Sequence, residues 1–273
     1  MADDPLSDFE RDEFTHGTRT RTVFRRGEGP AVVVIAEMPG ITPKVADFAR
    51  RVSDMGCTAV MPHLFGTPGL DPNAHGTAAG LKTMASSFVP ACVSREFTVL
   101  ATGRTSPVVD WLRALAEREH DRCGGPGVGA VGMCWTGGYA LAMAADDRLL
   151  APVLSQPSMP LGISRSRRRS LDISDRDLAK VRNRCAHDNL EVVGLRFTSD
   201  RLVPGERFEF LREQLGDAFI GIELDGSTAN PEAQIPPHSV LTEHLIDEPG
   251  EPTHDALMTV LEHLRGRLLE PAS

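Results

Sequence analysis

Val131-Gly132-Met133-Cys134-Trp135-Thr136-Gly137-Gly138 joins the end of an apolar strand directly to a Gly/Ala-rich helix through the pattern G-x-C-x-G-G. Such a turn strains its central residue, and the flanking glycines remove side chains that would collide with strand and helix. The pattern predicts a nucleophile elbow with Cys134 at its tip. There the unpaired N–H groups and the dipole of the helix favour a thiolate. A buried structural cysteine in a Gly-rich turn is the alternative.

Apolar strands and helices alternate on both sides of this turn. Strands are expected at residues 31–36, 58–61, 128–133, 151–154, 191–197 and 218–224. Helices are expected at residues 44–55, 107–115, 136–145, 206–215 and 257–268, with Ser106 capping the second of them. This alternation indicates βαβ units. The sequence therefore predicts an α/β protein with a doubly wound, mostly parallel sheet and helices on both faces.

The length of 273 residues suits one large domain or two small ones. We expect a polar, irregular N-terminal arm at residues 1–22 and a single α/β domain at residues 23–273. Residues 155–190 interrupt the alternation and carry prolines and the basic run at 165–169. We expect a cap-like insertion there, with the basic run on a solvated loop face.

Composition and charge narrow the class of protein. Hydrophobic residues make up 41 % and charged residues 25 %, as in soluble folded proteins, and the net charge of −9 disfavours nucleic acid and anionic lipid. The acidic N-terminus has no signal-like apolar stretch, and the longest aliphatic runs reach about six residues of the roughly 20 that span a bilayer. Five scattered cysteines without a C-x-x-C pair match neither a disulfide framework nor a zinc site. We expect a cytoplasmic monomer or homodimer without a metal, nucleic-acid or membrane partner.

Two residues on late loops could complete a site with Cys134. A cysteine nucleophile needs a base, and the base needs a carboxylate to orient it; in such folds the order along the chain is nucleophile, acid, histidine. Asp200 follows the strand at 191–197, and His238 follows the strand at 218–224. Singly, Asp200 would be an ordinary helix cap and His238 an ordinary loop residue. Their joint order favours Asp200 as the orienting acid and His238 as the base.

The end of the strand at 31–36 supplies further candidates. An oxyanion hole should combine the N–H of Trp135 with one from the loop after this strand. Since Pro39 has no N–H, Met38 is the expected donor. Glu37 is a carboxylate at a buried strand end and must be hydrogen-bonded, so we expect it to contact the thiol or an arginine. A purely structural Glu37 that caps a turn is the alternative.

The ordered set of motifs resembles the dienelactone hydrolase family of the α/β-hydrolase superfamily, over residues 32–264. The motifs are Glu37 before Met38-Pro39-Gly40, the run from Gly132 to Gly138, Asp200 before Val203-Pro204, and Pro237-His238-Ser239. The resemblance implies that Cys134 is the nucleophile, His238 its base and Asp200 the orienting acid, and that Glu37 pairs with the thiol and helps to activate it. It also implies hydrolysis of enol-lactones or other esters without a cofactor or metal.

The substrate-binding positions depart from that family. Its dienelactone-specific members hold the substrate carboxylate with arginines, one of them four residues after the catalytic histidine, where this chain has Thr242. The resemblance would assign Arg95 as the other arginine, and we expect His63 and Ser239 to line the pocket. The departure puts an acidic dienelactone substrate in question, but not ester hydrolysis.

Three functions are consistent with the sequence. The leading hypothesis is a cysteine hydrolase of a lactone or small carboxylic ester that acts through a thioester acyl-enzyme. An acyl-transfer or amide-cleaving enzyme could use the same Cys, His and Asp. A catalytically silent α/β-hydrolase that serves as a binding module is the third hypothesis.

Overall fold

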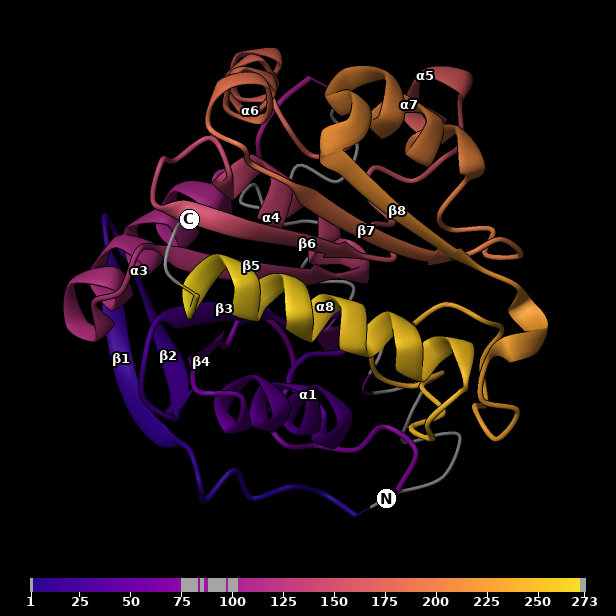
Figure 1. The fold of residues 1–273 in the computed structure, drawn as a ribbon. Coiled ribbons are helices and arrows are strands. Elements are labelled where there is room, and N and C mark those ends of the chain that lie inside the picture. Colours follow the sequence, from indigo (N-terminus) through magenta and orange to yellow (C-terminus); the bar gives the residue numbers. More distant parts are fainter. Residues whose placement is uncertain (1, 75–82, 84–85, 88–96, 98–102, 271–273) are drawn as a thin grey trace.

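The computed structural model describes residues 2–74, 83, 86–87, 97 and 103–270, which build one eight-stranded sheet with helices on both faces (Figure 1). The strands are β1 (Glu10–His16), β2 (Arg19–Arg26), β3 (Ala31–Ile35), β4 (Thr58–Pro62), β5 (Val128–Met133), β6 (Leu149–Ser155), β7 (Val192–Phe197) and β8 (Phe219–Leu224). Their order across the sheet is β1-β2-β4-β3-β5-β6-β7-β8. The pairs β1/β2 and β2/β4 are antiparallel and the other five are parallel, which confirms the predicted mostly parallel sheet.

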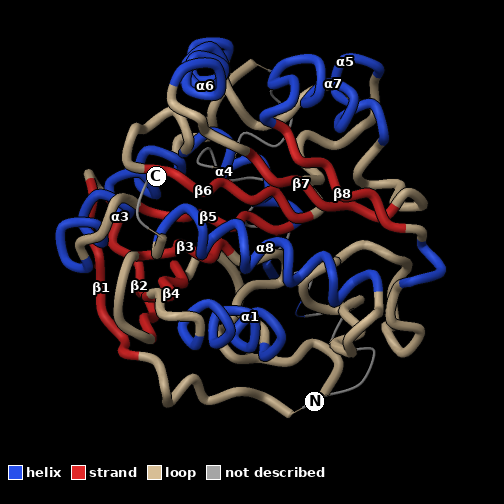
Figure 2. Tube along the Cα trace, in the orientation of Figure 1, coloured by secondary structure: helices blue, strands red, loops and turns tan. Residues whose placement is uncertain are grey.

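Helices connect the parallel strands, as Figure 2 shows by colour. They are α1 (Pro43–Asp54), α3 (Val108–Cys123), α4 (Gly137–Met143), α5 (Arg165–Arg168), α6 (Asp175–His187), α7 (Gly205–Leu215) and α8 (Pro252–Leu268). Helices α1 and α8 pack on one face of the sheet, and α3, α4, α6 and α7 pack on the other (Figure 1). The α/β fold with helices on both faces is therefore as predicted.

The apolar run of β3 shows why the sequence folds in these layers. All five of its residues are buried. Val33 and Ile35 belong to the core under α3 and α4, while Val32 and Val34 belong to the core under α1 and α8. Successive strand side chains point to opposite faces, so a strand covered on both sides must be apolar throughout.

The N-terminal segment differs from the expected irregular arm. Residues 10–16 and 19–26 form the antiparallel pair β1/β2, which extends the sheet beyond β4. Strand β1 is polar because it lies at the edge of the sheet, with most of its residues exposed. The inner end of β2 is anchored by Arg25, which is 2 % exposed and donates twice to Glu119 of α3, each bond being 2.7 Å long. An edge strand without an apolar pattern gives no periodic signal, which is why it was missed.

Residues 155–190 also differ from expectation, because most of the segment is an ordinary crossover rather than a cap. Helix α6 connects the parallel strands β6 and β7 and places Leu178 and Val181 in the same core as α4. It was not predicted because few of its positions are apolar. The basic run forms the short helix α5, and Arg168 and Arg169 pair with glutamates of α7. Within the described residues these two arginines are engaged in surface ion pairs.

Ser106 was predicted to cap α3, but it does not. The helix begins at Val108 without a side-chain cap, and the N–H of Ser106 instead donates to Oδ1 of Asp172 over 2.8 Å, while its hydroxyl donates to Oδ2. Burial raises the pKa of Asp172 to about 6, although the two bonds from Ser106 oppose this effect. Asp172 is thus a buried carboxylate that costs stability when it ionises.

We expect wild-type protein to lose stability relative to Asp172→Asn as the pH rises. The folded protein binds the Asp172 proton more tightly than the unfolded chain, so stabilisation present below the ordinary pKa of 3.8 is lost as the pH rises through about 6. The difference should reach about 2–3 kcal/mol. Urea denaturation of both proteins between about pH 4 and pH 7 measures it. A difference in unfolding free energy that stays constant over that range would contradict this account.

Candidate active site

Cys134 lies at the tip of a strand-turn-helix unit, between β5 and a 3₁₀ turn (Cys134–Thr136) that leads into α4. Its φ of 52° is left-handed, a strained conformation for a residue with a side chain. A Cβ atom at Gly132 would lie 2.3 Å from the carbonyl oxygen of Thr136, and one at Gly137 would lie 2.6 Å from Cα of Pro157. Glycine is therefore required at both positions, and the backbone forms the predicted elbow.

Thr136 ties this elbow to the neighbouring strand β3. Its buried hydroxyl donates to the carbonyl of Ile35 over 2.8 Å and accepts from the N–H of Met133 over 3.0 Å. One side chain therefore fixes the turn next to the strand end that carries Glu37 and Met38. We did not predict this role, because a threonine at the start of a helix is unremarkable in a sequence.

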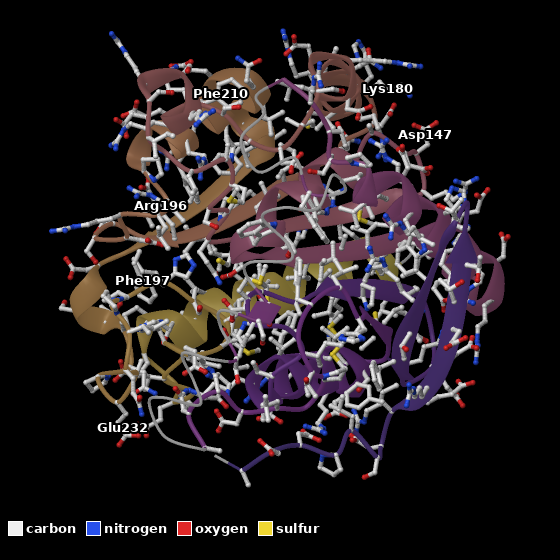
Figure 3. The ribbon with its side chains drawn as sticks, turned by 180° about the vertical axis from the view of Figure 1, so that it is seen from behind. Asp147, Lys180, Arg196, Phe197, Phe210 and Glu232 are labelled. Carbon is white, nitrogen blue, oxygen red and sulfur yellow. The ribbon has the colours of Figure 1, made fainter. Side chains whose placement is uncertain are left out.

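His238 and Asp200 meet at the carboxyl edge of the sheet. Nδ1 of His238 lies 2.6 Å from Oδ2 of Asp200, and both residues are buried. The other carboxylate oxygen of Asp200 accepts from the N–H of Leu202 over 2.8 Å, which fixes its orientation. Figure 3 shows Arg196 and Phe197 at the carboxyl end of β7, the strand that Asp200 follows. Asp147, which comes just before β6, lies on the opposite side of the molecule. The structure thus brings together two residues that are 38 positions apart.

The His238 ring also lies close enough to Cys134 to interact with its sulfur. Burial lowers the pKa of His238, but interactions with the Cys134 side chain and with the carboxylate of Asp200 outweigh it and hold this pKa well above 6.5. Nε2 itself is buried and has no hydrogen-bond partner among the described residues. It is therefore placed to exchange a proton with the thiol, a substrate or a water molecule.

Ser158 is a further polar neighbour of the sulfur. Its Oγ lies 3.4 Å from Sγ of Cys134, and its N–H donates to the carbonyl of Cys134 over 3.0 Å. The segment that carries it is held by Arg207 of α7, which is fully buried and donates to the carbonyls of Pro157 and Pro160 and to two others. Burial lowers the pKa of Arg207 to about 10. Neither Ser158 nor Arg207 was predicted, because the partner of Ser158 is 24 positions away and those of Arg207 are backbone carbonyls of distant segments.

Glu37 does not contact the groups that we expected. Its Oε2 accepts from Oγ of Ser239 over 2.6 Å and from Nε2 of Gln156 over 3.1 Å, and its Oε1 accepts from the hydroxyl of Thr242. In the described part of the chain neither the Cys134 thiol nor an arginine hydrogen-bonds to it. The expectation was wrong because three neutral donors already satisfy this buried carboxylate.

The other predicted site residues lie in different surroundings. Trp135 is buried next to Cys134, and Met38 is half-buried directly after Glu37. Ser239 points to Glu37 rather than into a pocket described here. His63 binds the carbonyl of Gly66 over 2.8 Å and lines a hollow beside β2, so its described contacts do not include Cys134. Arg95 lies outside the described residues.

Within the described residues, no group of three or more His, Cys, Asp or Glu side chains converges as metal ligands would. Nor does any described helix combine the length and apolar character needed to cross a lipid bilayer.

Several solved structures share this fold over nearly their whole length. A dienelactone hydrolase from Anabaena variabilis is 14 % identical, with 96 % of this chain and 99 % of that chain covered and a TM-score of 0.58. A dienelactone hydrolase-like promiscuous phosphotriesterase from metagenomic libraries is 16 % identical, with 95 % and 98 % covered and a TM-score of 0.58. An esterase from Pyrococcus furiosus is 13 % identical, with 95 % and 93 % covered and a TM-score of 0.57. At these identities the likeness concerns the fold.

No curated protein matches the chain. The model of the dienelactone hydrolase family matches residues 19–162, which is more than half of the sequence and includes β2 to β6 and the elbow at Cys134. The chain therefore belongs to the dienelactone hydrolase family, whose members are hydrolases with the α/β-hydrolase fold.

Proposed function

We propose that this hydrolase cleaves a lactone or small carboxylic ester, with Cys134 as the nucleophile and a thioester as the intermediate. The observation that carries the proposal is the His238 ring, which is bound through Nδ1 to Asp200 and lies close enough to Cys134 to interact with its sulfur. A base fixed in this way can hold the proton of a nucleophile and return it to a leaving group. Membership of the family supports the same reading.

In the first half of the reaction the thiolate of Cys134 attacks the ester carbonyl carbon and a C–S bond forms. The carbonyl oxygen becomes an oxyanion, for which the N–H groups of Met38 and Trp135 are the proposed donors. The C–O bond to the leaving group then breaks, and the imidazolium of His238 gives its proton to the departing alkoxide or enolate. A thioester on Cys134 remains.

In the second half, His238 removes a proton from a water molecule through Nε2 while the water oxygen attacks the thioester. The C–S bond breaks, the carboxylic acid leaves, and Cys134 returns as thiolate beside the imidazolium. Asp200 holds the ring in the required tautomer throughout, because its carboxylate accepts a hydrogen bond from Nδ1–H.

An ester is favoured over an amide because an alkoxide or enolate needs less protonation than an amine to leave. Acyl transfer and amide cleavage remain the competing enzymatic functions. Glutamine amidotransferases place histidine and acid two residues apart, whereas here the histidine and its acid come from separate loops after β7 and β8. We also propose that the protein acts in the cytoplasm, as a monomer or homodimer, where its thiols stay reduced.

We expect the purified protein to hydrolyse p-nitrophenyl esters and unsaturated lactones and to release no ammonia from glutamine. Rapid acid quenching followed by mass spectrometry should show the acyl group on the peptide that carries Cys134, since a thioester is the predicted intermediate. Ammonia release without ester turnover would instead identify an amide-cleaving enzyme. Absence of turnover, with Cys134 alkylated by iodoacetamide no faster than a free thiol, would identify a silent binding module.

A further inference from the structure

The loop that follows His238 is attached to the sheet through the carboxylate of Glu37. Ser239 and Thr242 each donate a hydroxyl to this carboxylate, and Glu37 itself is 5 % exposed at the end of β3. Glu37 is more than 200 residues away from both donors. A buried carboxylate that accepts several short hydrogen bonds is a rigid anchor, because breaking any of them leaves a polar group desolvated.

Gln156 extends the same anchor to the next strands. Its side-chain amide donates to Glu37 over 3.1 Å, and its carbonyl oxygen accepts from the N–H of Val240 over 3.3 Å. Gln156 is fully buried with a φ of 36°, and its own N–H donates to the carbonyl of Leu195 in β7. The end of β6 thus holds both the carboxylate and the loop.

His244 holds the loop at a second point. Its Nδ1 accepts from the N–H of Ser239 over 3.1 Å and from that of His238 over 3.4 Å, while Nε2 contacts the carbonyl of Ile235 over 3.0 Å. Burial lowers the pKa of His244, which suits a neutral ring that accepts at Nδ1. His238 therefore projects from a loop that is fixed through backbone and side-chain bonds on both sides.

We infer that Glu37 is a positioning residue for His238: it holds the loop 239–242 so that the imidazole faces the Cys134 sulfur, and it does not act on the thiol itself. The inference rests on the proposed function for the roles of Cys134 and His238. The inference assigns Ser239 and Thr242 to the same anchor, because each donates its hydroxyl to Glu37 and so does not offer it to a substrate.

The two possible roles of Glu37 predict opposite effects on the sulfur. If the carboxylate acted on the thiol as a base, loss of the Thr242 hydroxyl would make it more basic, and Thr242→Val would make Cys134 more reactive. If it positions His238, the same substitution loosens the loop, the thiolate loses its imidazolium partner, and Cys134 becomes less reactive. Glu37→Gln should lower the reactivity of Cys134 in either case and tests whether the carboxylate is needed at all. A glutamine at position 37 keeps the shape of the glutamate side chain, but its NH₂ group cannot accept the hydrogen bonds that the carboxylate oxygen accepts.

The experiment measures the rate of Cys134 alkylation by iodoacetamide near neutral pH, together with kcat and KM for a p-nitrophenyl ester. We expect Glu37→Gln to slow alkylation about tenfold and to lower kcat about 10- to 100-fold with little change in KM, since a misplacement of about 1 Å can cost about 10² in rate. Asp177→Asn is the matched control, a buried carboxylate at the start of α6 that accepts from the hydroxyl of Thr105 over 2.6 Å, and should leave both rates near wild type. Alkylation that is unchanged or faster in folded Glu37→Gln protein overturns the inference.

Thr242 supplies a second, gentler pair of variants. Thr242→Val removes the hydroxyl at nearly constant volume and should slow alkylation and kcat in the same direction by about three- to tenfold, whereas Thr242→Ser should restore both. If Glu37→Gln does not fold, the two Thr242 variants are sufficient to test the inference. Equal alkylation rates and equal kcat for Thr242→Val and Thr242→Ser would overturn it. Alkylation needs no substrate, so the role of Glu37 is tested even if Cys134→Ala retains ester turnover and the proposed function fails.

Discussion

Replacing Cys134 by alanine should lower ester turnover by at least about 10⁴-fold, because the proposed thioester cannot form without the sulfur. The fold should persist, since the elbow is held by backbone and by Thr136 rather than by the sulfur. Steady-state hydrolysis of a p-nitrophenyl ester and thermal unfolding of the same preparation measure the two quantities. Cys134→Ser should also be much slower, because a hydroxyl is far less acidic than a thiol.

The matched control for this substitution is Cys123→Ala. Cys123 is a half-buried free cysteine that ends α3, at the opposite edge of the sheet from the elbow. It should retain turnover and should not slow alkylation at Cys134. Undiminished hydrolysis by Cys134→Ala would remove the cysteine mechanism.

The second large effect is expected from Asp200→Asn. The amide preserves the volume of the carboxylate but cannot stabilise an imidazolium, and it can favour the wrong tautomer of His238, so kcat should fall by about 10²- to 10⁴-fold. The carboxylate is one of the groups that raise the pKa of His238, so the imidazolium should also be lost at lower pH in the variant. The pH profiles of kcat/KM and of Cys134 alkylation measure both effects.

An exposed acid on another turn provides the comparison for Asp200→Asn. Asp217 lies in the turn before β8 and is exposed, so Asp217→Asn changes the net charge equally without touching the site. If both variants had the same pH profile as wild type, the orienting role of Asp200 would be refuted.

Local sequence patterns predicted the buried strands and the sharp turn at Cys134, because neighbouring residues determine these features. The continuous apolar run of β3 and the glycines around Cys134 suffice to indicate a buried strand and a sharp turn, because each constraint acts over a few residues. Asp200 and His238 came from a different argument, the order in which loops follow late strands. Their 2.6 Å contact agrees with that order.

What the sequence could not indicate depends on contacts between distant segments. Glu37 was assigned to a thiol or an arginine because its true donors, Ser239 and Thr242, lie far along the chain and look like ordinary loop residues. Gln156 likewise follows a strand in a proline-containing stretch, where no pattern reveals a buried amide. Strand β1 and helix α6 were missed because few of their residues are apolar.

The left-handed backbone at Cys134 is maintained by Thr136, by the close approach at Gly132 and Gly137, and by the bond from Ser158. None of these supports involves the sulfur. The chain therefore separates the frame that presents a reactive atom from the choice of that atom, and a designer could install oxygen or selenium at position 134 and compare their intrinsic reactivities within an unaltered scaffold.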